Sequence, residues 1–192
     1  CDGSSGPNAI NPDTRKPWGG QFPQPQVQDW VRSQKWLAEH LGISRWAAVM
    51  GGSLGGMQAL QWAIDFPDWV EHCAALAAAP GLTAQNIAFN EIARHAILSD
   101  PDWHEGDYLA AGALPTRGVA LARMVGHLTY MSADGMSDRF GRELREGSFS
   151  PDDNAEWVFQ VESYLRHQGS RFSTQFDANT YVLMTQITLY LK

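Results

Sequence analysis

A glycine-rich turn around one serine constrains this chain most, because it directly follows a short apolar segment. The apolar segment Trp46-Ala47-Ala48-Val49-Met50 predicts a buried strand, and Gly51-Gly52-Ser53-Leu54-Gly55-Gly56 comes immediately after it. Residues Met57 to Phe66 have helical periodicity, and Pro67 ends that helix. The sequence therefore predicts a sharp strand-to-helix turn with a serine at its centre.

The segments around this turn predict an alternation of helices and strands. Helical spacing from Val27 to Leu41 ends at Gly42, and a second apolar strand is expected within Val70 to Ala79. This order is typical of a parallel sheet with helices on its faces. The later part of the chain predicts only helices, over Asn86 to Leu98, Val119 to Tyr130, Ala155 to Gln168 and Ala178 to Leu191.

The five residues Gly51-Gly52-Ser53-Leu54-Gly55 match Gly-x-Ser-x-Gly, the nucleophile elbow of α/β-hydrolase folds. In that turn the flanking glycines leave room for a strained backbone that exposes the serine hydroxyl. We expect Ser53 to be a nucleophile and the Leu54 N–H to be one donor to the oxyanion of acyl transfer. A purely structural turn and a phosphate-binding turn are the alternatives.

The expected fold class is α/β, an α/β-hydrolase fold whose sheet is partial and carries an inserted helical lid. Residues 1–81 are expected to form the partial core with the nucleophile elbow, residues 82–176 the lid, and residues 177–192 a helix that returns towards the core. Both ends of the chain look cut, so we expect a central fragment of a longer protein.

The partners of a catalytic serine follow it in this fold in the order Asp or Glu, then His. The carboxylates of Asp65, Asp134 and Asp177 are better suited to helix ends or caps than to a triad. The chain is therefore expected to hold the nucleophile without its triad Asp and His. The histidines expected to be surface or structural residues are His72, His95, His104, His127 and His167.

Composition and charge exclude several classes of protein. The chain has 44% hydrophobic and 18% charged residues, which is typical of a globular protein, and its 21 acidic and 14 basic residues give a net charge of −7. No basic cluster suits nucleic acid, and no apolar run has the roughly 18 residues of a membrane span. Cys1 and Cys73 suggest reduced thiols in a cytoplasmic protein. Neither a metal-ligand cluster nor a dinucleotide fingerprint is present in the sequence, so no metal or redox cofactor is expected.

Several segments together resemble the homoserine O-acyltransferases of methionine biosynthesis. The stretch from Gly52 to Trp62, Gly-Ser-Leu-Gly-Gly-Met-Gln-Ala-Leu-Gln-Trp, is the most specific of them. The others follow in the family's order: Gly3-Ser4-Ser5-Gly6-Pro7, Ile10-Asn11-Pro12, Ala84 to Glu91, Ala96 to Pro101, His127-Leu128-Thr129-Tyr130-Met131-Ser132, Val161 to Arg166 and Phe176 to Tyr181.

The resemblance implies an α/β-hydrolase-fold enzyme that acylates the hydroxyl of L-homoserine from an acyl-CoA, which is a co-substrate and not a cofactor. It implies that Ser53 carries the acyl group and that Arg123 binds the substrate. An arginine fork suits an amino-acid carboxylate, although from the sequence alone Arg123 would be an ordinary helix-surface residue. A homodimer formed largely through the lid is also implied.

The resemblance leaves the acyl donor open between succinyl-CoA and acetyl-CoA. Leu54 and the run from Gly126 to Met136 look more like the succinyl-using branch. The triad Asp and His are expected beyond Lys192, so the isolated chain is expected to be inactive, and residues 186–192 depart from the family's pattern. A homoserine O-acetyltransferase, a serine esterase of the same fold and a non-catalytic helical association fragment remain as alternatives.

Overall fold

The computed structural model describes residues 5–145 and 158–188, which fall into two compact units. The sheet unit comprises Pro23–Ile87 and Leu183–Lys192, and the helical unit comprises Cys1–Phe22 and Ala88–Val182. The expected α/β class is confirmed, because a parallel sheet with helices is followed along the chain by helices alone.

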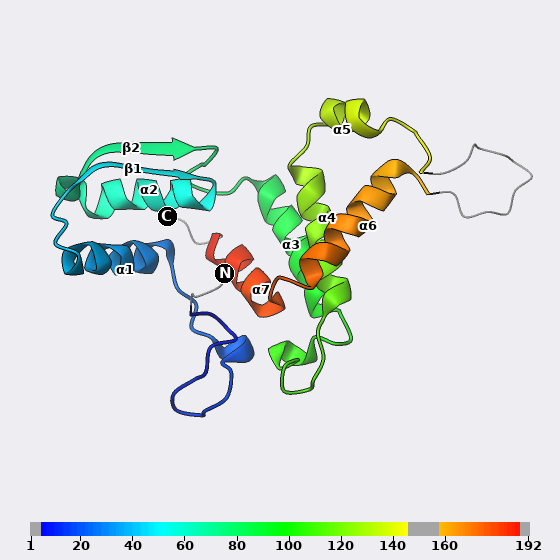
Figure 1. Ribbon diagram of the computed structural model, residues 1–192, viewed down its shortest axis with the longest axis horizontal. Coiled ribbons are helices and arrows are strands. Elements are labelled where there is room, and N and C mark those ends of the chain that lie inside the picture. Colours follow the sequence, from blue (N-terminus) through cyan, green and yellow to red (C-terminus); the bar gives the residue numbers. More distant parts are fainter. Residues whose placement is uncertain (1–4, 146–157, 189–192) are drawn as a thin grey trace, which may run out of the picture. The chain divides into compact units, whose positions relative to one another are not determined.

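The sheet unit contains two parallel strands with α2 packed against both of them and α1 packed against α2 (Figure 1). The strands pair from Trp46↔Val70 to Gly52↔Leu76. The elements of this unit are α1 (Val27–His40), β1 (Trp46–Gly52), α2 (Leu54–Asp65), the 3₁₀ helix η2 (Pro67–Trp69) and β2 (Val70–Leu76).

The boundaries of α1 follow from its capping residues. The Gln26 N–H donates to Asp29 Oδ2 at 2.8 Å, so a carboxylate satisfies one free donor at the start of the helix. At the other end Gly42 adopts φ +74°, and the Ile43 N–H donates back to the Ala38 carbonyl at 2.9 Å. Gly42 therefore ends the helix as the sequence predicted, because this left-handed backbone suits glycine.

The ends of several elements in the sheet unit differ from the predicted ones. Strand β1 runs to Gly52 and so includes two glycines predicted for the turn. Helix α2 begins at Leu54 and not at Met57, because the chain turns into the helix directly after Ser53. Strand β2 ends at Leu76, within the predicted range Val70 to Ala79, since Ala77 takes up a positive φ of 47° that breaks the extended backbone.

The helical unit is built around the packing of α4 (Thr116–Thr129) on α6 (Gln160–Ser173). Its core contains Ile97, Tyr108, Val119 and Ala122. The remaining elements are η1 (Gly19–Gln21), α3 (Ala84–Leu98), whose first turn lies in the sheet unit, η3 (His104–Gly106), α5 (Ala133–Phe140) and α7 (Ala178–Ile187), whose end lies in the sheet unit.

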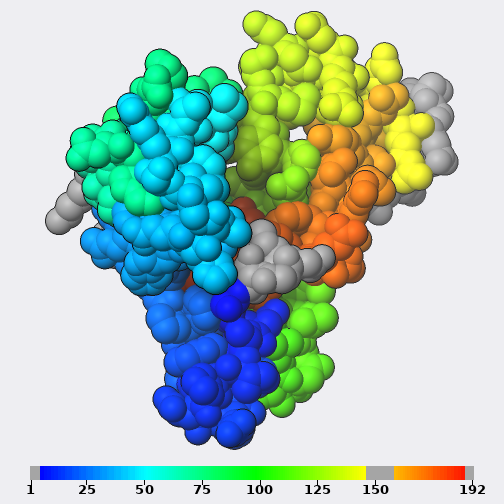
Figure 2. Space-filling view, turned by 60° about the vertical axis from the view of Figure 1, so that its left-hand side comes forward, coloured from blue at the N-terminus to red at the C-terminus, as the bar shows by residue number. Residues whose placement is uncertain are grey.

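The N-terminal segment of the helical unit packs against the loop around η3. Figure 2 shows the segment in dark blue and the loop in green. A Cβ atom on Gly20 would lie 3.2 Å from the Glu105 carbonyl oxygen, so the two backbones approach closely. The long N-terminal loop is therefore held by glycine-mediated contact with another loop of the same unit.

The four helices predicted for the later part of the chain are confirmed with shifted ends, and one helix was not predicted. The predicted end of α7 at Leu191 lies outside the described residues. Helix α6 begins at Gln160, and the predicted start at Ala155 lies outside the described residues. The unpredicted helix α5 has eight residues, and the Ser132 hydroxyl accepts the Gly135 N–H at 3.0 Å. That serine cap is its clearest sequence signal, because eight residues are too few to show a convincing period.

Candidate functional site

Ser53 occupies the turn between β1 and α2 with a backbone that serine seldom adopts. Its φ of 52° and ψ of −122° match the first central position of a type II′ turn, which glycine normally fills. The Ser53 N–H donates to the Leu76 carbonyl of β2 at 2.9 Å, and the Ser53 carbonyl accepts the Met57 N–H at 3.1 Å. Strand and helix together hold this strained turn, and Ser53 is exposed in the sheet unit.

Two glycines make the turn sterically possible. A Cβ atom on Gly51 would lie 2.2 Å from the Gly55 carbonyl oxygen, and one on Gly56 would lie 2.6 Å from the Ala78 Cβ. Gly55 has open space at its Cβ position within the described residues. The steric requirement thus falls on Gly51 and Gly56, although the motif names Gly51 and Gly55.

The Leu54 N–H stands at the beginning of α2, one residue after the Ser53 side chain. The first N–H groups of a helix have no acceptor within the helix, and the helix dipole adds a partial positive charge there. An anion that develops next to Ser53 would meet this donor. The arrangement is suited to stabilise an oxyanion, and the role predicted for Leu54 stays a prediction.

The sheet unit does not bring a histidine to Ser53 in its described part. Its histidines are His40, at the exposed end of α1, and His72 on β2, whose side chain is 77% exposed and lies 3.9 Å from Glu71. The Asp65 carboxylate accepts the Gln61 side-chain amide at 2.9 Å. Neither a base nor an orienting carboxylate contacts the serine within this unit.

Asp177, the last triad candidate considered, has a structural role in the helical unit. Its Oδ2 accepts the backbone N–H and the hydroxyl of Thr180, both at 2.7 Å, and its Oδ1 accepts the Tyr108 hydroxyl. It therefore caps the start of α7, as expected from the sequence. Burial, together with the hydrogen bond to Asp177, raises the pKa of Tyr108 well above its ordinary value.

Arg123 lies on α4 of the helical unit with its guanidinium 4.6 Å from the centroid of the Phe172 ring on α6. The side chain is partly buried, and within the described residues no carboxylate forms an ion pair or hydrogen bond with it. By contrast, Arg94 and Arg166 pair with glutamates. A half-buried arginine that stacks on an aromatic ring and lacks an anion is suited to bind one.

The positive charge of Arg123 affects the pKa of two titratable side chains, His127 and Tyr181. Burial lowers the pKa of His127, and the positive charge of Arg123 lowers it further. Burial raises the pKa of Tyr181, with a contribution from Tyr130, while Arg123 opposes that rise. The Tyr181 hydroxyl donates to the Ala122 carbonyl at 3.2 Å. The charge of Arg123 therefore acts on one imidazole, that of His127, and on one phenol, that of Tyr181.

The sequence missed the residues that hold this environment together. The Tyr164 hydroxyl and His127 Nδ1 lie 3.0 Å apart and join α6 to α4, while Phe172 supports the guanidinium. Helical periodicity places His127 one turn after Arg123, which was the available signal. The contacts with α6 have no sequence signal, because His127 and Tyr164 are 37 positions apart and Arg123 and Phe172 are 49 apart.

The described residues offer no metal site and no membrane helix. No cluster of three or more His, Cys, Asp or Glu side chains in residues 5–145 and 158–188 is placed to hold a metal ion. Within the same ranges, no helix combines the length and the apolar character needed to cross a membrane.

Comparison with known proteins bears out the resemblance to homoserine O-acyltransferases. The chain is 60% identical over 190 residues to the homoserine O-succinyltransferases of Saccharophagus degradans and Pseudomonas fluorescens Pf-5. Each alignment covers 99% of the chain and 50% of the relative, so the chain spans about half the length of the curated relatives it matches.

Solved structures agree with the fold. The homoserine O-acetyltransferase from Bacillus anthracis superposes with a TM-score of 0.87 at 27% identity and covers 98% of this chain and 50% of its own. Esterase E22 superposes with a TM-score of 0.82 at 30% identity and covers 97% of this chain and 50% of its own. The family model of the alpha/beta hydrolase fold matches residues 1–185. The chain therefore belongs to the α/β-hydrolase fold family.

Proposed function

We propose that the protein containing this chain transfers a succinyl group from succinyl-CoA to the side-chain hydroxyl of L-homoserine. The observation that carries this proposal is the 60% identity to curated homoserine O-succinyltransferases along almost the whole chain. Acetyl-CoA is the competing donor, because the superposed Bacillus anthracis structure is an acetyltransferase at 27% identity.

In the proposed reaction the Ser53 hydroxyl attacks the thioester carbonyl. The C–S bond then breaks, CoA leaves as the thiol, and a succinyl ester remains on Ser53. The Leu54 N–H stabilises the oxyanion of each tetrahedral intermediate. The homoserine hydroxyl then attacks the ester carbonyl, which gives O-succinylhomoserine and restores Ser53.

Arg123 is proposed to hold the homoserine carboxylate. Its guanidinium has no carboxylate partner among the described residues, and the Phe172 ring fixes its position. A guanidinium can give two parallel hydrogen bonds to a carboxylate, which orients the amino acid for attack. We also propose that the predicted lid, residues 82–176, keeps water from the acyl-serine, since water would convert transfer into hydrolysis.

The test is an assay of the longer protein, whose coding sequence must first be read on both sides of this segment. Succinyl-CoA should support acylation of homoserine better than acetyl-CoA, and Ser53→Ala should abolish both reactions. A preference for acetyl-CoA would overturn the donor assignment. An unaffected Ser53→Ala variant would overturn the mechanism and favour a non-catalytic association role.

The second candidate is a serine esterase, favoured by the superposition with esterase E22 at 30% identity. Arg123→Ala separates the two functions. A transferase should lose about 10- to 150-fold in kcat/KM for homoserine, because a hydrogen bond to a charged group contributes about 1.5–3 kcal/mol. Hydrolysis of a simple ester without a carboxylate should stay unchanged in that variant. An enzyme that hydrolyses esters and never acylates homoserine would be an esterase.

We further propose that the protein is a cytoplasmic homodimer. Cys73 is a free thiol, which suits a reducing compartment. Exposed leucines on the helices of the helical unit, among them Leu121 and Leu128 on α4, offer apolar surface for association. Light scattering of the longer protein tests this assembly, and a monomer at micromolar concentration would contradict it.

A further inference from the structure

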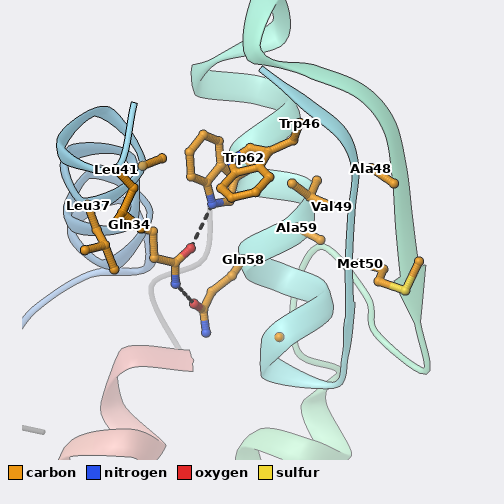
Figure 3. A pocket seen from close by; sticks show the side chains of 12 residues that line it. Gln34, Leu37, Leu41, Trp46, Ala48, Val49, Met50, Gln58, Ala59 and Trp62 are labelled. Carbon is orange, nitrogen blue, oxygen red and sulfur yellow. Dashed lines mark hydrogen bonds between the residues drawn. The ribbon is translucent and has the colours of Figure 1, made fainter. Parts of the chain in front are cut away.

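The acyl-CoA donor of the proposed reaction carries a pyrophosphate and a 3′-phosphate, and such anions bind to clustered cations. The chain has a net charge of −7, so these cations must be gathered locally. The cavity of about 440 Å³ in the sheet unit offers none, because its lining residues are uncharged (Figure 3). Its Gln34 side chain is also occupied, since it accepts the Trp62 Nε1–H at 2.7 Å and donates to Gln58 Oε1 at 2.6 Å. The phosphates therefore need cations outside this cavity.

Arg139 on α5 and Arg142, two residues after the end of α5, are exposed arginines without an acidic partner. Neither forms an ion pair or a hydrogen bond with a carboxylate in residues 5–145 and 158–188. The neighbouring acids do not neutralise them. Asp138 forms no ion pair with Arg139, and the Glu143 carboxylate accepts the Gln160 side-chain amide at 3.1 Å. Both guanidiniums are therefore available to an anion.

Aromatic rings hold the two guanidiniums in place. The Arg139 guanidinium lies 4.9 Å from the centroid of the Tyr164 ring and 5.1 Å from that of Phe140. The Arg142 guanidinium lies 5.9 Å from the centroid of the Phe159 ring. Phe140 is buried, and its ring centroid lies 5.0 Å from that of Tyr164, which anchors α5 to α6. A guanidinium stacked on a ring keeps its N–H groups at the edge free to donate to phosphate oxygens.

Backbone pairing fixes the segment that carries Arg142 beside the start of α6. Leu144 and Phe159 form an antiparallel bridge, and the Arg145 N–H donates to the Val158 carbonyl at 2.9 Å. Phe159 is the N-cap residue of α6, and Tyr164 is the fifth residue of that helix. Both guanidiniums therefore lie at the same end of α6, three residues apart in the chain.

We infer, on the basis of the proposed function, that Arg139 and Arg142 form a binding surface for the phosphate groups of the acyl-CoA donor. The two guanidiniums give charge-assisted hydrogen bonds to the pyrophosphate and the 3′-phosphate, and the rings of Tyr164 and Phe159 keep them oriented. The surface belongs to the predicted lid, which thereby binds the donor in addition to excluding water. It acts on the carrier part of the donor and not on the acyl group.

The test compares two donors in the longer protein, succinyl-CoA and succinylpantetheine, which has the same thioester without phosphate. The double variant Arg139→Gln/Arg142→Gln should raise the KM for succinyl-CoA about tenfold or more, because it removes both cations. The KM for succinylpantetheine and that for homoserine should not change. The matched control is Arg171→Gln, which removes an exposed arginine from the other end of α6 and should leave all three values unchanged.

An unchanged KM for succinyl-CoA in the double variant would overturn the inference. Equal losses with both donors would also overturn it, because the arginines would then act through the structure of the lid. A protein that uses neither donor would refute the proposed function instead. Calorimetric binding of adenosine 3′,5′-bisphosphate, the phosphate-bearing end of CoA, then decides on the surface. The double variant should bind it about tenfold more weakly, and equal binding or none by the native protein would refute the surface.

Discussion

Replacement of Ser53 by glycine should give a more stable protein than replacement by alanine, although both substitutions remove the proposed nucleophile. The backbone at this position is held at φ 52° and ψ −122°, a conformation that costs about 1–3 kcal/mol for a residue with a Cβ atom. Glycine relieves that strain, but it loses more backbone entropy on folding, which costs about 0.5–1 kcal/mol. With both terms near the middle of their ranges, Ser53→Gly should be about 1 kcal/mol more stable than Ser53→Ala.

Urea unfolding of the two variants, followed by tryptophan fluorescence, measures this difference. A gain of about 1 kcal/mol corresponds to a rise of about 2–4 °C in Tm for a protein of this size. Ser33 in α1 provides the matched pair, because Ser33→Gly should be about 0.5–1 kcal/mol less stable than Ser33→Ala in an ordinary helix. If Ser53→Gly were no more stable than Ser53→Ala, the turn would store no strain.

Two further predictions concern the helical unit. Tyr108→Phe should lower the free energy of unfolding in urea by about 1–3 kcal/mol, because Tyr108 is 1% exposed and its hydroxyl contacts both Asp177 and the Asn179 N–H. The control is Tyr130→Phe, at an exposed tyrosine. Equal effects of the two substitutions would refute the role of the Tyr108 hydroxyl. The pKa of His127 is lower in the folded protein than its unfolded value of about 6.5. The contribution of His127 to folding stability is therefore complete above about pH 6.5, and it decreases as the pH falls towards the folded pKa. The native protein should therefore exceed His127→Gln in free energy of unfolding by less at pH 5.5 than at pH 7.5. The matched variant is His167→Gln, at an exposed histidine. A difference that grows on acidification would contradict this reasoning.

The local pattern predicted the sheet unit well because its signals are short-range. The apolar run at Trp46–Met50, the glycines after it and the terminator Gly42 each act within a few residues, and each lies where expected. Helix α5 was missed because eight residues give too little periodicity, and the true start of α2 was missed because Ser53 itself is the N-terminal cap.

The candidate site likewise combines residues that the sequence indicated with supporting residues that only the packing places. The motif identified Ser53 and Leu54, and the family resemblance added Arg123, but neither revealed what supports them. The role of Gly56 depends on Ala78, which lies after the next strand, and the position of the Arg123 guanidinium depends on Phe172, two helices later. Such contacts are set by the packing of segments that are distant in the sequence.

The sequence by itself determined the strand–turn–helix around Ser53 and the order of helices and strands, because backbone preference and apolar period are local properties. The tertiary structure alone decided that Gly51 and Gly56 are the glycines sterically required at the turn, and that the Arg123 guanidinium stacks on Phe172. The physical reason is that close approach, burial and pairing depend on which distant segments meet, and that information is spread over the whole chain.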